Sequence, residues 1–258
     1  MVFTTSEITA YVGTLLWPLF RVAGLIMTAP VFAAKTVPVR IRLGLSIAIT
    51  VMILPIMPPA PTVELFSPSA FFLVAQQLLI GVLMGFTLQI VLAAIVTGGQ
   101  IVAMQMGLGF AAMVDPQNGA QTPVLSQFYV IMVVLIYLAM NGHLVLIEVL
   151  VDSFKTMPVS VGGLMPGDFY KVVHWAAILF SGAVAIAIPA IASLLIVNFT
   201  FGIMTRAAPQ MNIFAIGFPL TMLLGYGVVF ATLPSVVPQS SKLFTGAYHL
   251  LKSIVGGV

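Results

Sequence analysis

Hydrophobic residues along this chain form long runs separated by short polar or proline-rich stretches. The runs cover about residues 8–30, 43–59, 70–104, 124–151, 175–205 and 213–237. A helix needs about 20 apolar residues to cross the hydrocarbon core of a bilayer, and most of these runs reach that length. The pattern therefore predicts about six apolar segments, followed by a mildly amphipathic tail at 238–258.

The segments read as helices and not as strands. None of them alternates between apolar and polar positions, and Leu, Ala, Ile and Met dominate their composition. Strands of a membrane barrel would alternate over about ten residues, and inside lipid only helices and closed barrels satisfy every backbone group. We therefore expect an all-α, polytopic membrane-type fold in which residues 1–258 form one domain.

Composition supports a membrane environment. Hydrophobic residues make up 61% of the chain and charged residues only 6%, whereas soluble domains are about one quarter charged. The net charge of +3 is scattered along the chain, so nothing resembles the basic patch of a nucleic-acid-binding protein. The first connection, with Lys35, Arg40 and Arg42, is the most basic one, which predicts that it lies in the cytoplasm and the N-terminus outside.

Sequence motifs for catalysis or cofactors are missing. The chain has no cysteine and no HExxH, P-loop or GxSxG pattern. Residues 107–112 fit GxGxxA, but no strand precedes them and no acidic residue follows at the required distance, so a dinucleotide site is not expected. We expect no enzyme activity, no cofactor and no metal site.

Two kinds of residue inside the apolar segments have open interpretations. Arg21 and Glu148 are ionisable, which makes them functional candidates by default, although an interior partner or snorkelling would explain Arg21 as well. Gly81 and Gly85 form a GxxxG spacing, and Ala183, Ala187 and Ala190 are spaced similarly. Such spacing serves close helix packing inside one chain or an interface between subunits.

The region 100–126 is the most informative part of the chain. It contains five glycines at or near it, the methionines 104, 106 and 113, an Asp115-Pro116 helix stop and several polar residues. Non-helical backbone between two apolar helices must be buried in protein or line a cavity. Because methionines provide adaptable apolar surface, we interpret this stretch as a re-entrant or pore-lining loop.

A second polar turn is predicted within 202–219. Arg206 is the only charged residue between Lys171 and Lys242. Pro209 prevents a helix from continuing past it, and Asn212 is suited to cap the helix that follows. The turn is either an anchor on the cytoplasmic side or a specific contact site.

These two stretches resemble the signature sequences of a known family. GLGFAAMVDPQNGAQTPVLSQF and RAAPQMNIFAIGFP are similar to those of the FliR family, whose virulence-secretion counterpart is SctT. Size, segment number and motif order also fit, so the resemblance covers nearly the whole chain. It implies a non-enzymatic subunit of the flagellar type III export gate, located in the bacterial inner membrane at the flagellar basal body.

The resemblance also implies partners and site residues. One FliR-like subunit joins several copies of FliP and FliQ in a helical assembly, with FlhB and FlhA nearby, so that the apolar segments form helical hairpins against sister subunits. Unfolded flagellar proteins pass through the channel of this assembly. The implied plug residues are Met106, Gly107, Gly109, Phe110, Met113, Asp115, Pro116 and Gln117. The implied cytoplasmic turn contains Arg206, Pro209 and Asn212.

Two other function classes are alternatives to this one. A small-molecule secondary transporter would also use a broken helix near the membrane midplane, but it usually carries more polar groups there. An intramembrane enzyme would need a base close to Ser126, Ser181 or Ser193, and only folding could bring His143 near them.

Overall fold

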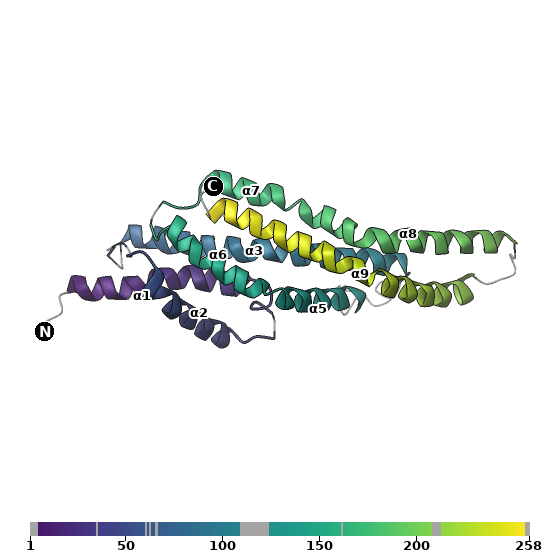
Figure 1. Cartoon of the computed structure of the whole chain (residues 1–258), viewed down its shortest axis with the longest axis horizontal. Coiled ribbons are helices and arrows are strands. Elements are labelled where there is room, and N and C mark those ends of the chain that lie inside the picture. Colours follow the sequence, from purple (N-terminus) through teal and green to yellow (C-terminus); the bar gives the residue numbers. More distant parts are fainter. Residues whose placement is uncertain are drawn as a thin grey trace. The chain divides into compact units, whose positions relative to one another are not determined.

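The structure is a computed structural model, and every regular element in its described part is a helix (Figure 1). The described residues are 5–34, 36–59, 61, 63–64, 67–108, 124–160, 162–207 and 213–255. The elements are α1 (Thr5–Thr28), α2 (Val39–Ile53), the short 3-10 helix η1 (Leu54–Ile56), α3 (Pro68–Gln105), α5 (Val124–Ala139), α6 (Gly142–Thr156), α7 (Pro166–Trp175), α8 (Ile178–Ala207) and α9 (Ile213–Val255).

Several of these helices are long and apolar enough to cross a membrane. Within the described residues they are Val39–Ile56, Pro68–Gln105, Pro166–Ala207 and Pro219–Val255, and the pair α5–α6 adds a fifth if it counts as one broken span. The expected all-α polytopic membrane fold is therefore confirmed. Among the described residues, the helices long enough to span number four or five, against about six expected apolar segments. The described apolar part of α1, Gly13–Thr28, is shorter than a full span.

The chain divides into two compact units. Unit 1 contains Met1–Ile90, Asn141–Ala176 and Thr245–Val258, and unit 2 contains Val91–Met140 and Ala177–Phe244. Both units combine segments that are far apart in the sequence. The long helices α3 and α9 each contribute one part to unit 1 and another part to unit 2.

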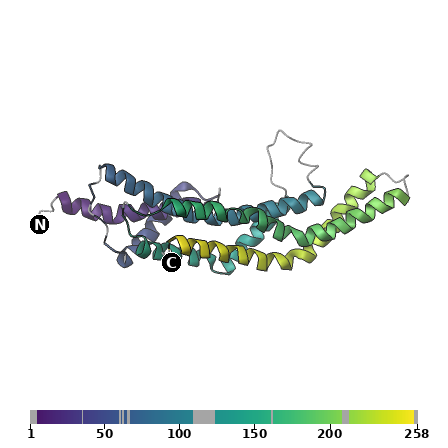
Figure 2. The ribbon, with the colours of Figure 1, turned by 90° about the horizontal axis from the view of Figure 1, so that it is seen from above.

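In unit 1, α1 packs closely against the first half of α3 (Figure 2). A Cβ atom added at Gly24 would lie 2.7 Å from the carbonyl oxygen of Leu78. One added at Gly81 would overlap the backbone of Arg21, and one added at Gly85 would overlap Thr28. The GxxxG spacing of α3 therefore serves packing inside this chain, which decides between the two interpretations that the sequence left open.

Small residues also determine the packing of unit 2. A Cβ atom at Gly98 would lie 3.0 Å from the carbonyl oxygen of Ala183 in α8, and one at Gly99 would lie 2.8 Å from the Cα atom of Ser126 in α5. Ala183, Ala187 and Ala190 are all buried in α8. The second half of α3 is therefore in backbone contact range of two other helices, as expected for association without water-driven burial.

The segment predicted at 124–151 is broken into two helices. Asn141 adopts a left-handed conformation with φ 57° and ψ 26°, and α5 and α6 meet at an angle of 63°. The break falls at Asn141-Gly142-His143, where Asn tolerates this backbone region better than most residues. The second part, α6, then continues to Thr156, past the predicted end of the segment at residue 151.

The predicted sixth segment and the tail are one helix. α9 runs for 43 residues from Ile213 to Val255 and contains Pro219, Pro234 and Pro238. Its last part buries apolar side chains, among them Phe244, Ala247 and Leu251. This burial stabilises the helix beyond the point where hydropathy alone placed its end.

Candidate functional site

The candidate loop begins at a well-defined helix end. The N–H of Leu108 donates to the carbonyl of Ala103 at 3.0 Å, and the N–H of Gly107 donates to the carbonyl of Met104 at 3.0 Å. Gly107 has a φ of 81°. This is the Schellman arrangement, in which a left-handed residue, usually Gly, satisfies the last carbonyl groups of a helix. Gly107 therefore ends α3 and directs the chain away from the helix axis.

The methionines near this cap have different environments. Met106 is fully buried. It packs against Gly225 in α9, because a Cβ atom added at Gly225 would lie 2.8 Å from the Cε and Cγ atoms of Met106. Met104, two residues earlier, is 66% exposed. Met106 thus anchors the start of the loop against α9, within unit 2, while Met104 remains available for contacts outside this chain.

Most of the expected plug lies outside the described residues. Gly109, Phe110, Met113, Asp115, Pro116 and Gln117 belong to this group. The chain is described again from Val124, where α5 begins.

The second candidate turn lies between α8 and α9. Arg206 is exposed in the last turn of α8, where a positive charge interacts favourably with the helix dipole. Pro209 and Asn212 lie outside the described residues, and α9 begins at Ile213. The ends of α8 and α9 that flank this turn extend beyond the end of α3 (Figures 1 and 2), so the helix ends that flank the two candidate regions are not adjacent.

The hydrogen-bond partners of the Arg21 side chain all lie inside unit 1. The side chain is fully buried. Its Nε atom donates to Oε1 of Gln77 at 2.9 Å, and Nη1 donates to the carbonyl and the hydroxyl oxygens of Ser153 at 2.8 and 3.0 Å. Nη2 donates to the carbonyl of Met157 at 2.8 Å, and the guanidinium carbon lies 4.3 Å from the ring centroid of Phe154. One side chain thereby links α1, α3 and the end of α6.

Arg21 stands out in the sequence as an ionisable residue in an apolar segment, but its partners could not be predicted from it. Gln77, Ser153 and Met157 lie 56, 132 and 136 positions away in the sequence. Their residue types carry no signal of the contact, because two of the four acceptors are backbone carbonyls. Since neutral oxygens satisfy the guanidinium, Arg21 holds three helices together and is not poised for chemistry.

The remaining polar residues of the apolar helices do not assemble a reactive centre in the described part of the chain. Glu148 is exposed on α6, and Ser126 is buried beside Gly99. The Ser193 hydroxyl donates to the carbonyl of Pro189 at 3.0 Å. The described residues also contain no group of three or more His, Cys, Asp or Glu residues suited to hold a metal ion.

Comparison with known proteins gives consistent matches over nearly the whole chain. Residues 12–247 match the family described as bacterial export proteins, family 1. The chain is 39% identical to the flagellar biosynthetic protein FliR of Escherichia coli (strain K12), over 98% of this chain and 96% of that protein. It is 34% identical to the protein of the same name from Pectobacterium carotovorum, over 99% and 97%. The Bacillus subtilis (strain 168) protein of that name is 26% identical, over 91% and 92%.

Proposed function

This chain belongs to the FliR family of bacterial export proteins, and we propose that it forms part of the channel of the flagellar export gate and carries the plug of that channel. Membership makes it a membrane protein of the flagellar export apparatus. The proposal adds a specific role for the loop after α3. It is carried by one observation, namely that this loop starts from a capped and anchored helix end.

The anchored end suits a plug. A loop that closes a channel must start from a fixed point, or its tip would not return to the same place after each exported chain. Gly107 fixes the direction in which the chain leaves α3, and Met106 is buried against α9. We propose that residues 106–117 form the plug, with Met106 and Gly107 as its fixed root and the residues after them as its moving part.

The composition of the loop also suits a plug. Thioether side chains adapt to apolar surfaces of different shape, and glycines allow backbone conformations that other residues disfavour. The stretch 104–119 contains three methionines and a single charged residue, Asp115. Such a loop would close around varied unfolded chains and would attract few ions.

The wider setting is part of the same proposal. We place the whole chain, residues 1–258, as a single functional domain in the bacterial inner membrane at the flagellar basal body. FliP and FliQ, in several copies each, would cover the exposed apolar helix faces, with FlhB and FlhA nearby. The Arg206 turn, with Pro209 and Asn212, would face the cytoplasm, and exported flagellar proteins would pass the loop.

Deleting Gly107 to Asp115 tests the plug. We expect the assembled export gate to leak small ions more than the unaltered gate, because the channel would lose its closure. The measurement is ion flux through the purified complex in liposomes, with native mass spectrometry to verify that FliP and FliQ are still bound.

A deletion of residues 160–164 is the matched control, since this connection between α6 and α7 is not assigned to the channel. It should leave the leak unchanged. An intact complex with the 107–115 deletion and no additional leak would refute the plug, while the family assignment would stand.

A further inference from the structure

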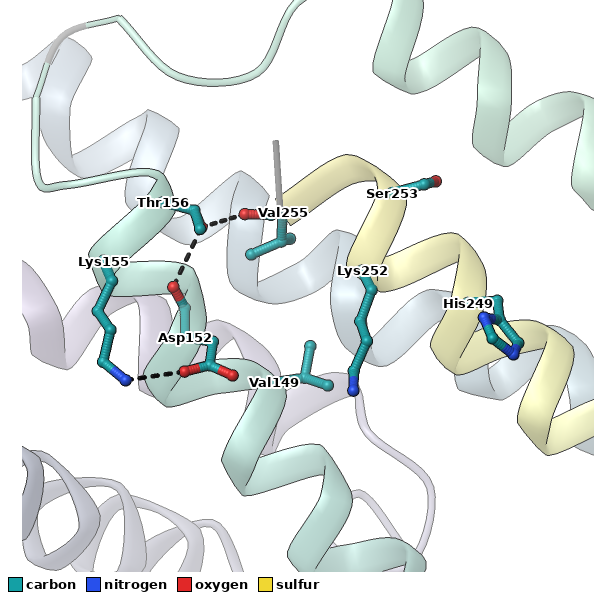
Figure 3. Close-up of a pocket in the computed structure, with 8 residues that line it drawn as sticks. All are labelled: Val149, Asp152, Lys155, Thr156, His249, Lys252, Ser253 and Val255. Carbon is teal, nitrogen blue, oxygen red and sulfur yellow. Dashed lines mark hydrogen bonds and ion pairs between the residues drawn. The ribbon is translucent and has the colours of Figure 1, made fainter. Parts of the chain in front are cut away.

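The ends of α6 and α9 enclose a pocket in unit 1 that the export function does not explain (Figure 3). Its volume is about 520 Å³. It is lined by Val149, Asp152, Lys155, Thr156, His249, Lys252, Ser253 and Val255. The two helix ends are linked by the Thr156 hydroxyl, which bonds to the carbonyl of Val255.

The pocket carries an excess of positive charge. Lys155 forms an ion pair with Asp152, with 2.9 Å between Nζ and Oδ1. Lys252 is exposed and makes no ion pair within the described residues, and Figure 3 shows its ammonium extending toward Val149. Two lysines and one aspartate leave a net charge of +1 before His249 is counted. An anion is therefore the ligand type that this lining favours.

The pocket lies where two membrane-length elements end. The α9 span finishes at Val255, and the broken span α5–α6 finishes at Thr156. Lysines near the ends of spans extend to the depth of the lipid headgroups, where an ammonium group can pair with a lipid phosphate. An anionic lipid headgroup therefore suits both the positive charge of the pocket and the depth in the membrane at which the pocket is expected.

The neighbouring helix α7 has the composition of a membrane interface. Tyr170 is 72% exposed and stacks on His174 with 6.2 Å between ring centroids. Lys171 lies between them in the sequence and forms an ion pair with Asp168 at 3.2 Å. Aromatic residues with a polar edge are enriched at the headgroup level of bilayers. This places a second, independent interfacial feature in unit 1, where the pocket lies.

We propose that this pocket binds the phosphate of an anionic phospholipid headgroup. Lys252 would provide the unpaired cation, Lys155 would contribute a second positive charge, and Val149 and Val255 would border the glycerol region of the lipid. Asp152 would remain neutralised by Lys155. The proposal depends on the packing of α6 and α9 alone and not on the plug.

Lipid binding to the full chain in detergent tests the site. The probe is phosphatidylglycerol, with phosphatidylcholine as a lipid without net charge, and retained lipid is counted by native mass spectrometry. Lys252→Gln should weaken phosphatidylglycerol binding by up to about fivefold, since an exposed ion pair contributes up to about 1 kcal/mol. Lys252→Arg should restore it. Lys242→Gln removes an exposed charge from the same helix and should have no effect.

Three outcomes would overturn the proposal. Equal loss in Lys252→Gln and Lys242→Gln would indicate general charge attraction. Equal retention of phosphatidylcholine and phosphatidylglycerol would exclude recognition of the negative headgroup. Displacement of the lipid by millimolar inorganic phosphate would identify free phosphate, and not lipid, as the occupant. Circular dichroism of each variant establishes that its helices are intact.

Discussion

At the scale of single residues, Arg21 shows how a charge is accommodated inside an apolar chain. Burying a charged group is costly unless hydrogen bonds satisfy it. Here four hydrogen bonds to neutral oxygens and a contact with the Phe154 ring offset that cost. Arginine suits this site because its planar guanidinium carries five donors in fixed directions, which lysine cannot reproduce.

Replacing Arg21 should therefore destabilise unit 1. Arg21→Met keeps much of the volume but leaves Gln77 and Ser153 without their buried donor. An unsatisfied buried polar group costs about 1–3 kcal/mol, so we expect the free energy of unfolding to fall by about 3 kcal/mol. Thermal unfolding of the chain in detergent, followed by circular dichroism, measures the change.

Arg40→Met is the control for this experiment, because Arg40 is exposed on α2 and makes no ion pair among the described residues. Its unfolding temperature should stay close to that of the unaltered chain. Similar losses in both variants would mean that the hydrogen bonds of Arg21 contribute nothing specific.

At the scale of elements, the contact between α1 and α3 depends on glycine. With the hydrophobic effect absent inside lipid, helices associate through close van der Waals packing, and small residues permit it. Gly24, Gly81 and Gly85 leave no room for a methyl group on either helix. The crossing is thus determined by backbone approach, and larger residues would force the helices apart.

Gly81→Ala tests this contact. Its new methyl group would overlap the backbone of Arg21, which cannot move without shifting the helix, so we expect a loss of about 1–3 kcal/mol in unfolding free energy. Gly44→Ala on α2 is the matched substitution, since nothing lies within 4 Å of the added atom. That variant should gain up to about 1 kcal/mol from helix propensity. Thermal unfolding distinguishes them, and equal effects would contradict the packing argument.

At the scale of the whole molecule, the orientation of the chain in the membrane follows from charge. The basic first connection predicts a cytoplasmic location for residues 35–42. From there, α2, α3, the pair α5–α6 and α7–α8 make four further spans, which places the Arg206 turn in the cytoplasm. α9 is then a fifth span, and its end lies on the opposite side. The Thr156–Val255 bond agrees with this count, because both residues end spans that should finish on the same side.

The absence of cysteine makes this orientation easy to test. Thr36→Cys and Arg206→Cys should react with a membrane-impermeant maleimide only from the cytoplasmic side, and Lys252→Cys only from the other side. All three positions are exposed. Labelling of all three from one side would contradict the predicted topology.

Much of this architecture was determined by the sequence alone. An apolar chain with few charges must form helices in lipid, because no other open structure satisfies its backbone groups. The end of the third helix near Gly107 could be predicted as well, since a glycine-rich stretch follows the apolar run at 70–104 and glycine tolerates left-handed backbone that most other residues avoid. The family resemblance rested on two continuous motifs and needed no tertiary information.

Only the tertiary structure decided which helices meet. Hydropathy gives the same value to a side chain that faces lipid and to one that faces another helix, so it could not place Met106 against α9 or extend α9 through the tail. The partners of Arg21 and the lysines of the pocket come from segments far apart in the sequence. Local patterns carry no information about such contacts, because they arise only when packing brings distant helices together.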